Sequence, residues 1–323
     1  MMHYSGAEGK AVPVESPEDW EIRRSHILAN MQLVMGDPPP DTRRCALDVQ
    51  VLEEVQTETY LRRKITYMAE EGDRVPAYLF IPTSVHGRVP GIVCLHQTTA
   101  VGKAEPAGIG GLPNLHYAGE LAEHGYVTIA PDYPGYGDYQ FDAYANGYVS
   151  ATMKGIYNHS RAIDVLASLP EVDGERIGCI GHSLGGHNTL FLAAFDERVG
   201  VAVTSCGFSS FRKYKDGDIA GWSHKGYMPR IADLYGARAE TMPFEFSEVL
   251  GAIAPRAVFV NAPTGDTNFP LEGVLECLAA AQPVYALYGA HGRLEAAHPE
   301  CGHDFPPEVR EQAYAFIDSV LKG

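Results

Sequence analysis

The sequence predicts an α/β fold in which a mostly parallel central sheet is flanked by helices. Six short apolar runs are nearly continuous, as expected of strands whose two faces are both covered by helices. Helix-like segments separate these runs, and such alternation favours parallel pairing of the strands. The predicted strands are 89–97, 126–132, 176–183, 199–207, 256–263 and 283–289, and the predicted helices lie near 113–124, 142–169, 184–196, 270–281 and 307–321.

The segment before these strands has its own pattern. Residues 17–35 place Trp20, Ile27, Met31 and Val34 at helical spacing among charges, and the following "GDPPP" ends the helix. The β-rich runs 59–68 and 75–82, separated by "AEEGDR", predict an antiparallel hairpin at a sheet edge. We therefore expect an N-terminal helical arm over 1–45 and one domain over 46–323.

Residues 207–248 form a long excursion that interrupts the alternation of strands and helices. It leaves the predicted sheet at the edge where parallel strands end, and it is longer than usual connections. Its aromatic residues, Trp222 and Tyr227 among them, alternate with basic residues such as Lys213. One interpretation is a solvated loop. The other is a partial lid that contacts substrate through Trp222 and Tyr227 and favours anionic esters.

Composition and charge exclude several kinds of partner. The chain has 25 basic and 41 acidic residues, and its net charge of −16 would repel a phosphate backbone and an anionic membrane. No apolar run approaches the roughly 18 residues of a membrane-spanning helix. The six scattered cysteines fit a reducing compartment. We expect a cytoplasmic protein with no nucleic-acid or membrane partner. Its oligomeric state is left open, with a homodimer as one option.

Ser183 lies at a predicted strand-to-helix turn, within Gly181-His182-Ser183-Leu184-Gly185. This is the G-x-S-x-G pattern in the context that a nucleophilic serine requires. Its glycines let the strand and the helix pass closely, because they have no Cβ. The helix N-terminus beside the serine favours a developing negative charge. Since Ser is also a preferred helix N-cap, the motif alone leaves both interpretations open.

A serine nucleophile needs a histidine base, and that base needs a carboxylate partner. Asp266 follows the predicted strand 256–263, and His303 precedes the last helix, so the chain order is Ser, Asp, His. Asp266 could instead only shape a turn, and Asp304 is a rival acid. A metal cluster of His298, Cys301 and His303 is the remaining alternative, without matching ligands elsewhere. His182 and His187 are interpreted as packing or rim residues. We expect no metal.

Two backbone N–H groups should bind the oxyanion of the tetrahedral intermediate. Leu184 directly follows the serine, and Gln97 ends the predicted strand 89–97, at the position where the second donor is expected. Thr98, the next residue along the chain, is the alternative to Gln97 as the second donor.

These residues resemble the α/β-hydrolase superfamily, in its dienelactone-hydrolase, acetyl-xylan-esterase and prolyl-oligopeptidase-like branch. The resemblance rests on "VDGERIGCIGHSLGG", "APDYPGYGD", "IAPRAVFV" and "CGHDFP", and it spans about residues 60–321. It implies Ser183 as nucleophile, Asp266 as acid and His303 as base. The departures are Gln97 in place of the usual glycine, serine in place of the cysteine nucleophile of dienelactone hydrolase, and the N-terminal arm.

The sequence therefore predicts a serine hydrolase that cleaves small-molecule carboxylic esters through an acyl-enzyme, without a cofactor. Two alternatives remain at this stage. A peptidase or amidase would use the same three residues, and a non-catalytic scaffold would keep only the fold.

Overall fold

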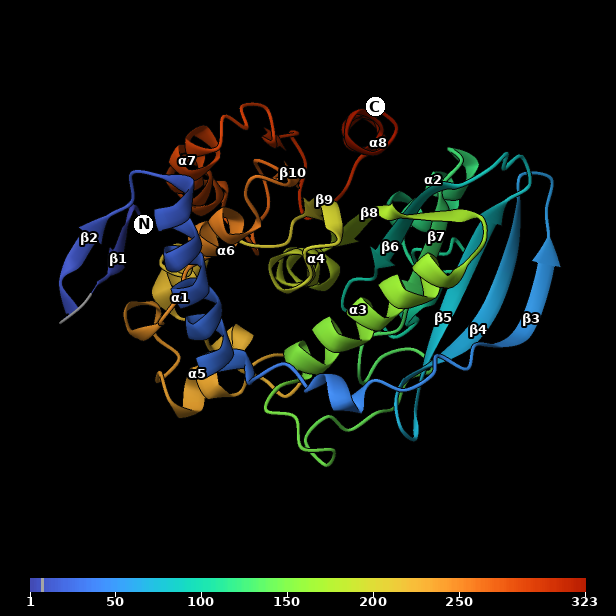
Figure 1. Cartoon of the computed structure of the whole chain (residues 1–323), viewed down its shortest axis with the longest axis horizontal. Helices are drawn as coiled ribbons and strands as arrows, with labels where there is room; N and C mark the ends of the chain where they lie inside the picture. Colours follow the sequence, from blue (N-terminus) through green and yellow to red (C-terminus); the bar gives the residue numbers. More distant parts are fainter. Residues whose placement is uncertain (7–8) are drawn as a thin grey trace.

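The computed structural model describes residues 1–6 and 9–323, and a nine-stranded sheet forms its centre (Figure 1). The strand order is β11-β10-β9-β8-β6-β7-β5-β4-β3. Neighbours from β11 to β7 run parallel, whereas β5, β4 and β3 continue the sheet in antiparallel fashion. The strands are β3 (Gln50–Gln56), β4 (Tyr60–Glu70), β5 (Asp73–Pro82), β6 (Val89–Leu95), β7 (Val127–Pro131), β8 (Val172–His182), β9 (Val199–Ser205), β10 (Ala257–Asn261) and β11 (Leu294–Ala297). The predicted fold class is confirmed.

Helices cover both faces of this sheet (Figure 1). One apolar cluster joins the sheet to α1, α3, α4, α6 and α7, and a second joins its other face to α2 and α8. The helices are α1 (Pro17–Met35), α2 (Tyr117–Glu123), α3 (Ala151–Ser168), α4 (Leu184–Phe195), α5 (Arg230–Asp233), α6 (Phe246–Ile253), α7 (Leu271–Leu287) and α8 (Pro307–Leu321). Because both faces are covered, the carboxyl ends of the parallel strands are the edge where polar side chains can gather.

The N-terminal segment packs against the main body. Helix α1 begins and ends where the sequence predicts, and Ser16 and Asp19 form a reciprocal capping box at its start. Trp20 and Ile27 are buried in the same apolar cluster as the sheet, and Arg23 pairs with Glu248 of α6. A small hairpin of β1 (His3–Ser5) and β2 (Ala11–Pro13) precedes the helix. The arm is therefore held by buried apolar surface as well as by charge.

The predicted hairpin over 59–82 is confirmed as β4 and β5, but the predicted strand 283–289 is wrong. Residues 283–287 form the last part of α7, with Pro283 inside the helix. Ala281, Val284 and Tyr285 are buried, and their spacing places them on one helical face. That burial outweighs the β-propensity of the residues and the hydrogen bond that Pro283 removes.

Two strands that the sequence did not predict complete the sheet. Strand β11 pairs with β10 in parallel register, with Leu294 beside Val258. Strand β3 forms the opposite edge, where Val51 and Leu52 remain exposed. The predicted helix 142–169 also begins later, because Ser150 caps α3 by accepting a hydrogen bond from the Met153 N–H at 3.0 Å. None of the described helices is both long enough and apolar enough to cross a membrane.

Candidate active site

Ser183 occupies a strained turn between β8 and α4. Its φ of 52° and ψ of −114° lie where residues with a side chain are rarely found. The glycines around it are needed for close approach: a Cβ on Gly181 would collide with the Gly185 backbone, and a Cβ on Gly185 would collide with the Leu95 carbonyl. The serine side chain makes no cap hydrogen bond to α4. The helix-cap interpretation of Ser183 is therefore wrong, and the steric interpretation of the motif is confirmed.

His303 and Asp266 come together at the same edge of the sheet. His303 Nδ1 lies 2.8 Å from Asp266 Oδ2, and the carboxylate of Asp266 is buried. Asp266 Oδ1 accepts hydrogen bonds from the backbone N–H groups of Asn268 and Phe269. Burial acts to raise the pKa of Asp266, but the hydrogen bond from His303 and these N–H groups outweigh it and lower the pKa. Asp266 is therefore an ionised partner for His303.

The rival acid, Asp304, points elsewhere. Its carboxylate accepts a hydrogen bond from Asn114 Nδ2 at 2.8 Å. Its backbone carbonyl accepts from Asn261 Nδ2 at 2.9 Å. Asp304 thus fixes the loop that carries His303, while Asp266 is the carboxylate that contacts the imidazole.

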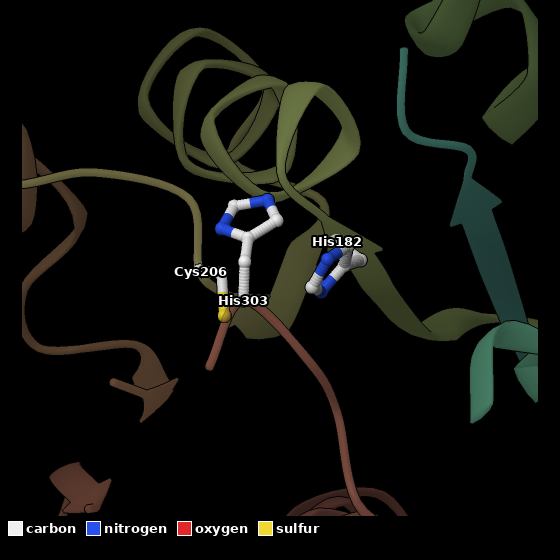
Figure 2. Close-up of side chains that lie close together, drawn as sticks. All are labelled: His182, Cys206 and His303. Atoms are coloured by element: carbon white, nitrogen blue, oxygen red, sulfur yellow. The ribbon is translucent and has the colours of Figure 1, made fainter. Parts of the chain in front are cut away.

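His182 and Cys206 flank His303 (Figure 2). The rings of His182 and His303 meet edge to face, with centroids 4.8 Å apart. His182 Nδ1 lies 2.8 Å from Ser205 Oγ, which also accepts from Asn261 Nδ2 at 2.8 Å. Burial, and secondarily His303, lower the pKa of His182 to about 3, so His182 is a neutral packing partner. The sequence carries no local signal for the role of Ser205, which ends β9, of Cys206, which follows it, or of Asn261, which ends β10.

Among the described residues, His182, Cys206 and His303 are the one group whose nitrogen and sulfur atoms lie close enough to suggest a metal site. Each of them is already engaged: His303 with Asp266, His182 with Ser205, and Cys206 Sγ with the Asp304 carbonyl at 3.4 Å. Burial raises the pKa of Cys206 well above its ordinary value, so its thiolate form is disfavoured. The His298 ring instead contacts the Ala262 carbonyl. These contacts fit a hydrogen-bonded histidine better than a metal ligand set.

The loop after β6, which carries Gln97, is tied down by buried charges. Lys103 Nζ lies 2.7 Å from Asp132 Oδ2, and the Lys103 N–H donates to Asp132 Oδ1. Gln97 Nε2 donates to the Glu105 carboxylate, and the backbone carbonyl of Gln97 lies 2.6 Å from His96 Nδ1. Leu184 opens α4, so its N–H has no partner within the helix. The Ser183 N–H, in contrast, donates to the Ser205 carbonyl and is not free to bind an oxyanion.

The 207–248 excursion closes over the first turn of α4. Trp222 is only 3% exposed and packs against His187, Phe246 and Phe269. Tyr227 is partly exposed, and its hydroxyl lies 3.1 Å from Thr98 Oγ1. Tyr227 thus lies beside the candidate site, whereas the buried Trp222 packs against the ring of Tyr227. Lys213 is paired with Glu272 at 2.6 Å, so its charge is compensated.

A family model of fungal glucuronyl esterase matches residues 134–289 of this chain. The match includes Ser183 and Asp266 and ends before His303. A putative hydrolase, YtaP, from Bacillus subtilis is 26% identical over 89% of this chain and 96% of its own length. The 4-O-methyl-glucuronoyl methylesterase of Schizophyllum commune is 25% identical over 96% of this chain and 80% of its own.

The fold recurs in a solved glucuronoyl esterase from Solibacter usitatus, which superposes with a TM-score of 0.77 at 20% identity. The superposition covers 97% of this chain and 95% of that one. The recognition of an α/β-hydrolase made from the sequence is confirmed, and so is the assignment to ester hydrolysis. The chain is a carboxylesterase-type hydrolase with the α/β-hydrolase fold.

Proposed function

We propose that this esterase works through Ser183, His303 and Asp266, with Leu184 and Gln97 as oxyanion donors. The observation that carries the proposal is the 2.8 Å contact between His303 and Asp266, at the sheet edge where Ser183 occupies its strained turn. His303 and Asp266 are in contact at that edge, and Ser183, Asp266 and His303 follow one another along the chain in the order expected of an α/β-hydrolase triad, which supports the proposal.

The steps follow from these contacts. Ser183 Oγ attacks the ester carbonyl while His303 takes its proton, and the ionised Asp266 stabilises the imidazolium that forms. The N–H groups of Leu184 and Gln97 bind the oxyanion of the tetrahedral intermediate. His303 then donates the proton to the departing alcohol, which leaves the acyl group on Ser183. A water molecule, activated by His303, releases the acid and restores the serine.

The substrate that we propose is a carbohydrate ester, specifically the ester of a uronic acid. The support is the match of 134–289 to the glucuronyl esterase model and the relative from Schizophyllum commune, which aligns over nearly the whole chain. Such an ester is uncharged before cleavage. It therefore needs no cation at the site, in agreement with the pairing of Lys213.

A panel of three substrates tests this proposal: p-nitrophenyl acetate, methyl glucuronate and an aminoacyl p-nitroanilide. We expect hydrolysis of both esters and at least a hundredfold lower kcat/KM for the anilide. Preference for the anilide would identify a peptidase or amidase. Turnover of none of the three by folded protein would indicate a scaffold. Hydrolysis of p-nitrophenyl acetate alone would be consistent with the proposed mechanism but would contradict the proposal that the substrate is a uronic acid ester.

A cytoplasmic location is part of the same proposal. Its support is that all six cysteines are unpaired, four of them buried, as is typical of a reducing compartment. Fractionation of cells that express the full chain tests it, and recovery of the protein outside the cytoplasm would contradict it.

A further inference from the structure

A cavity lies beside the candidate active site. It has a volume of about 360 Å³, is open to solvent on one side, and is lined by the loop after β7, residues 134–151, and by the turn 224–226 of the excursion. This volume is in the range of small-molecule sites. None of Ser183, Asp266 and His303 lines it, so it has no role in the chemistry described above.

The cavity adjoins the region next to the nucleophile. Tyr136 and Ala151 line it, and both also belong to the apolar cluster around Leu184. On the other side, the ring of His224 lies 4.2 Å from that of Tyr227, which contacts Thr98. A ligand whose reacting ester lies at Ser183 would reach this cavity by extending past Tyr136 and Tyr227.

The two walls are joined by direct hydrogen bonds. The hydroxyl of Tyr144 donates to the Lys225 carbonyl at 2.5 Å, and that of Tyr133 donates to the Gly226 carbonyl at 3.0 Å. The Gly226 N–H donates to His224 Nδ1 at 3.0 Å. The cavity is therefore formed without a ligand, which lowers the ordering cost of binding.

The lining combines aromatic rings with polar groups. Tyr136, Phe141 and Tyr144 are partly exposed, so their rings are available for stacking. Asp142, His224 and Lys225 are exposed at the same cavity. A sugar ring has an apolar C–H face that packs on aromatic rings and an edge of hydroxyls that needs both donors and acceptors.

We propose that this cavity is a saccharide subsite, which binds the sugar unit next to the one that carries the ester. The inference rests on the proposed function, since it assumes a carbohydrate ester at Ser183. It places recognition of the longer substrate on Tyr144 and Lys225, outside the reacting centre.

The test compares two substrates in the full-length protein. One is methyl glucuronate, and the other is a disaccharide that ends in methyl glucuronate. The measured quantity is the ratio of kcat/KM for the disaccharide to that for the monosaccharide. We expect Tyr144→Ala to lower this ratio about tenfold and Lys225→Ala about fivefold, as for the loss of a single stacking or hydrogen-bonding contact.

Tyr144→Phe keeps the ring and should retain the ratio within about twofold, which separates stacking from the hydroxyl contact that holds the wall. Tyr235→Ala and Lys215→Ala are matched controls from the same excursion, outside the cavity, and should leave the ratio unchanged. An unchanged ratio in Tyr144→Ala, or a wild-type protein that gains nothing from the second sugar, would overturn the subsite.

The same assays distinguish the two levels of the proposal. Failure of the subsite leaves hydrolysis of methyl glucuronate dependent on Ser183. Failure of the proposed substrate abolishes hydrolysis of both sugar esters while p-nitrophenyl acetate is still cleaved, and it overturns the subsite as well.

Discussion

The turn at residues 181–187 and the excursion at 207–248 border the same site, but different forces hold them in place. The turn is fixed by steric exclusion, because the glycines at 181 and 185 meet neighbouring backbone directly. The excursion is fixed by aromatic packing, in which Trp222 contacts rings from α4, α6 and the loop after β10. A short motif can therefore specify the first region, whereas the second depends on residues far apart in the sequence.

The largest effect is expected at the centre of the turn. Ser183→Ala should lower kcat/KM for p-nitrophenyl acetate by about 10⁴-fold or more. The fold should survive, because alanine keeps the Cβ and the serine makes no cap hydrogen bond. Steady-state kinetics with a thermal unfolding curve measures both. Wild-type turnover in the folded variant would exclude Ser183 as nucleophile.

The next largest effect is expected at the carboxylate that contacts His303. Asp266→Asn should lower kcat by about 10²- to 10⁴-fold, since an amide does not balance the imidazolium and favours the wrong tautomer. Asp304→Asn is the matched control and should cost less than about tenfold, because its carboxylate bonds Asn114. Kinetics of the two variants under one set of conditions ranks them. The reverse ranking would move the acid to position 304.

Trp222→Ala tests the aromatic packing of the excursion. Removal of this buried ring should lower the free energy of unfolding by about 3–5 kcal/mol. Trp222→Phe should recover more than half of the loss. Urea unfolding followed by circular dichroism measures both variants. A stability near wild type in Trp222→Ala would mean that the excursion is a loosely attached loop.

Acidification is expected to have a smaller effect, on the free energy of unfolding. Burial lowers the pKa values of His159, His182 and His187 to about 3, whereas unfolded histidine titrates near 6.5. The unfolded state therefore takes up protons first as the pH falls below about 6.5, and stability is lost. Between pH 6.5 and 5.5 this costs about 1 kcal/mol per histidine.

Glu245, at the end of the excursion, changes the stability in the opposite direction on acidification. Burial raises its pKa to about 7, so the folded state gains a proton in this window and is stabilised by about 1 kcal/mol. The net expectation is a loss of about 2 kcal/mol on acidification to pH 5.5, and Glu245→Gln should enlarge it. Urea midpoints at the two pH values measure the difference. Equal stabilities would contradict the assignment of neutral buried histidines.

The sequence was informative where short-range chemistry decides the structure. The helix over 17–35, the glycines around Ser183 and the strand before Asp266 all have local signals, and each lies where the pattern predicts. Residues 283–289 were misassigned because burial of Val284 and Tyr285 on a helical face overrode their β-propensity. Ser205, which contacts His182, and Asn261, which donates to Ser205 and to the Asp304 carbonyl, had no local signal beyond their place at strand ends, since only the folded register brings β8, β9 and β10 together.

The central claim is that Ser183 forms a covalent intermediate with the help of His303 and Asp266. Treatment of the full-length protein with a fluorophosphonate, followed by peptide mass spectrometry, tests it most directly. We predict stoichiometric modification of Ser183 in the wild-type protein and labelling at least a hundredfold slower in Asp266→Asn. Modification at another residue, or no modification of a protein that still hydrolyses p-nitrophenyl acetate, would contradict the claim.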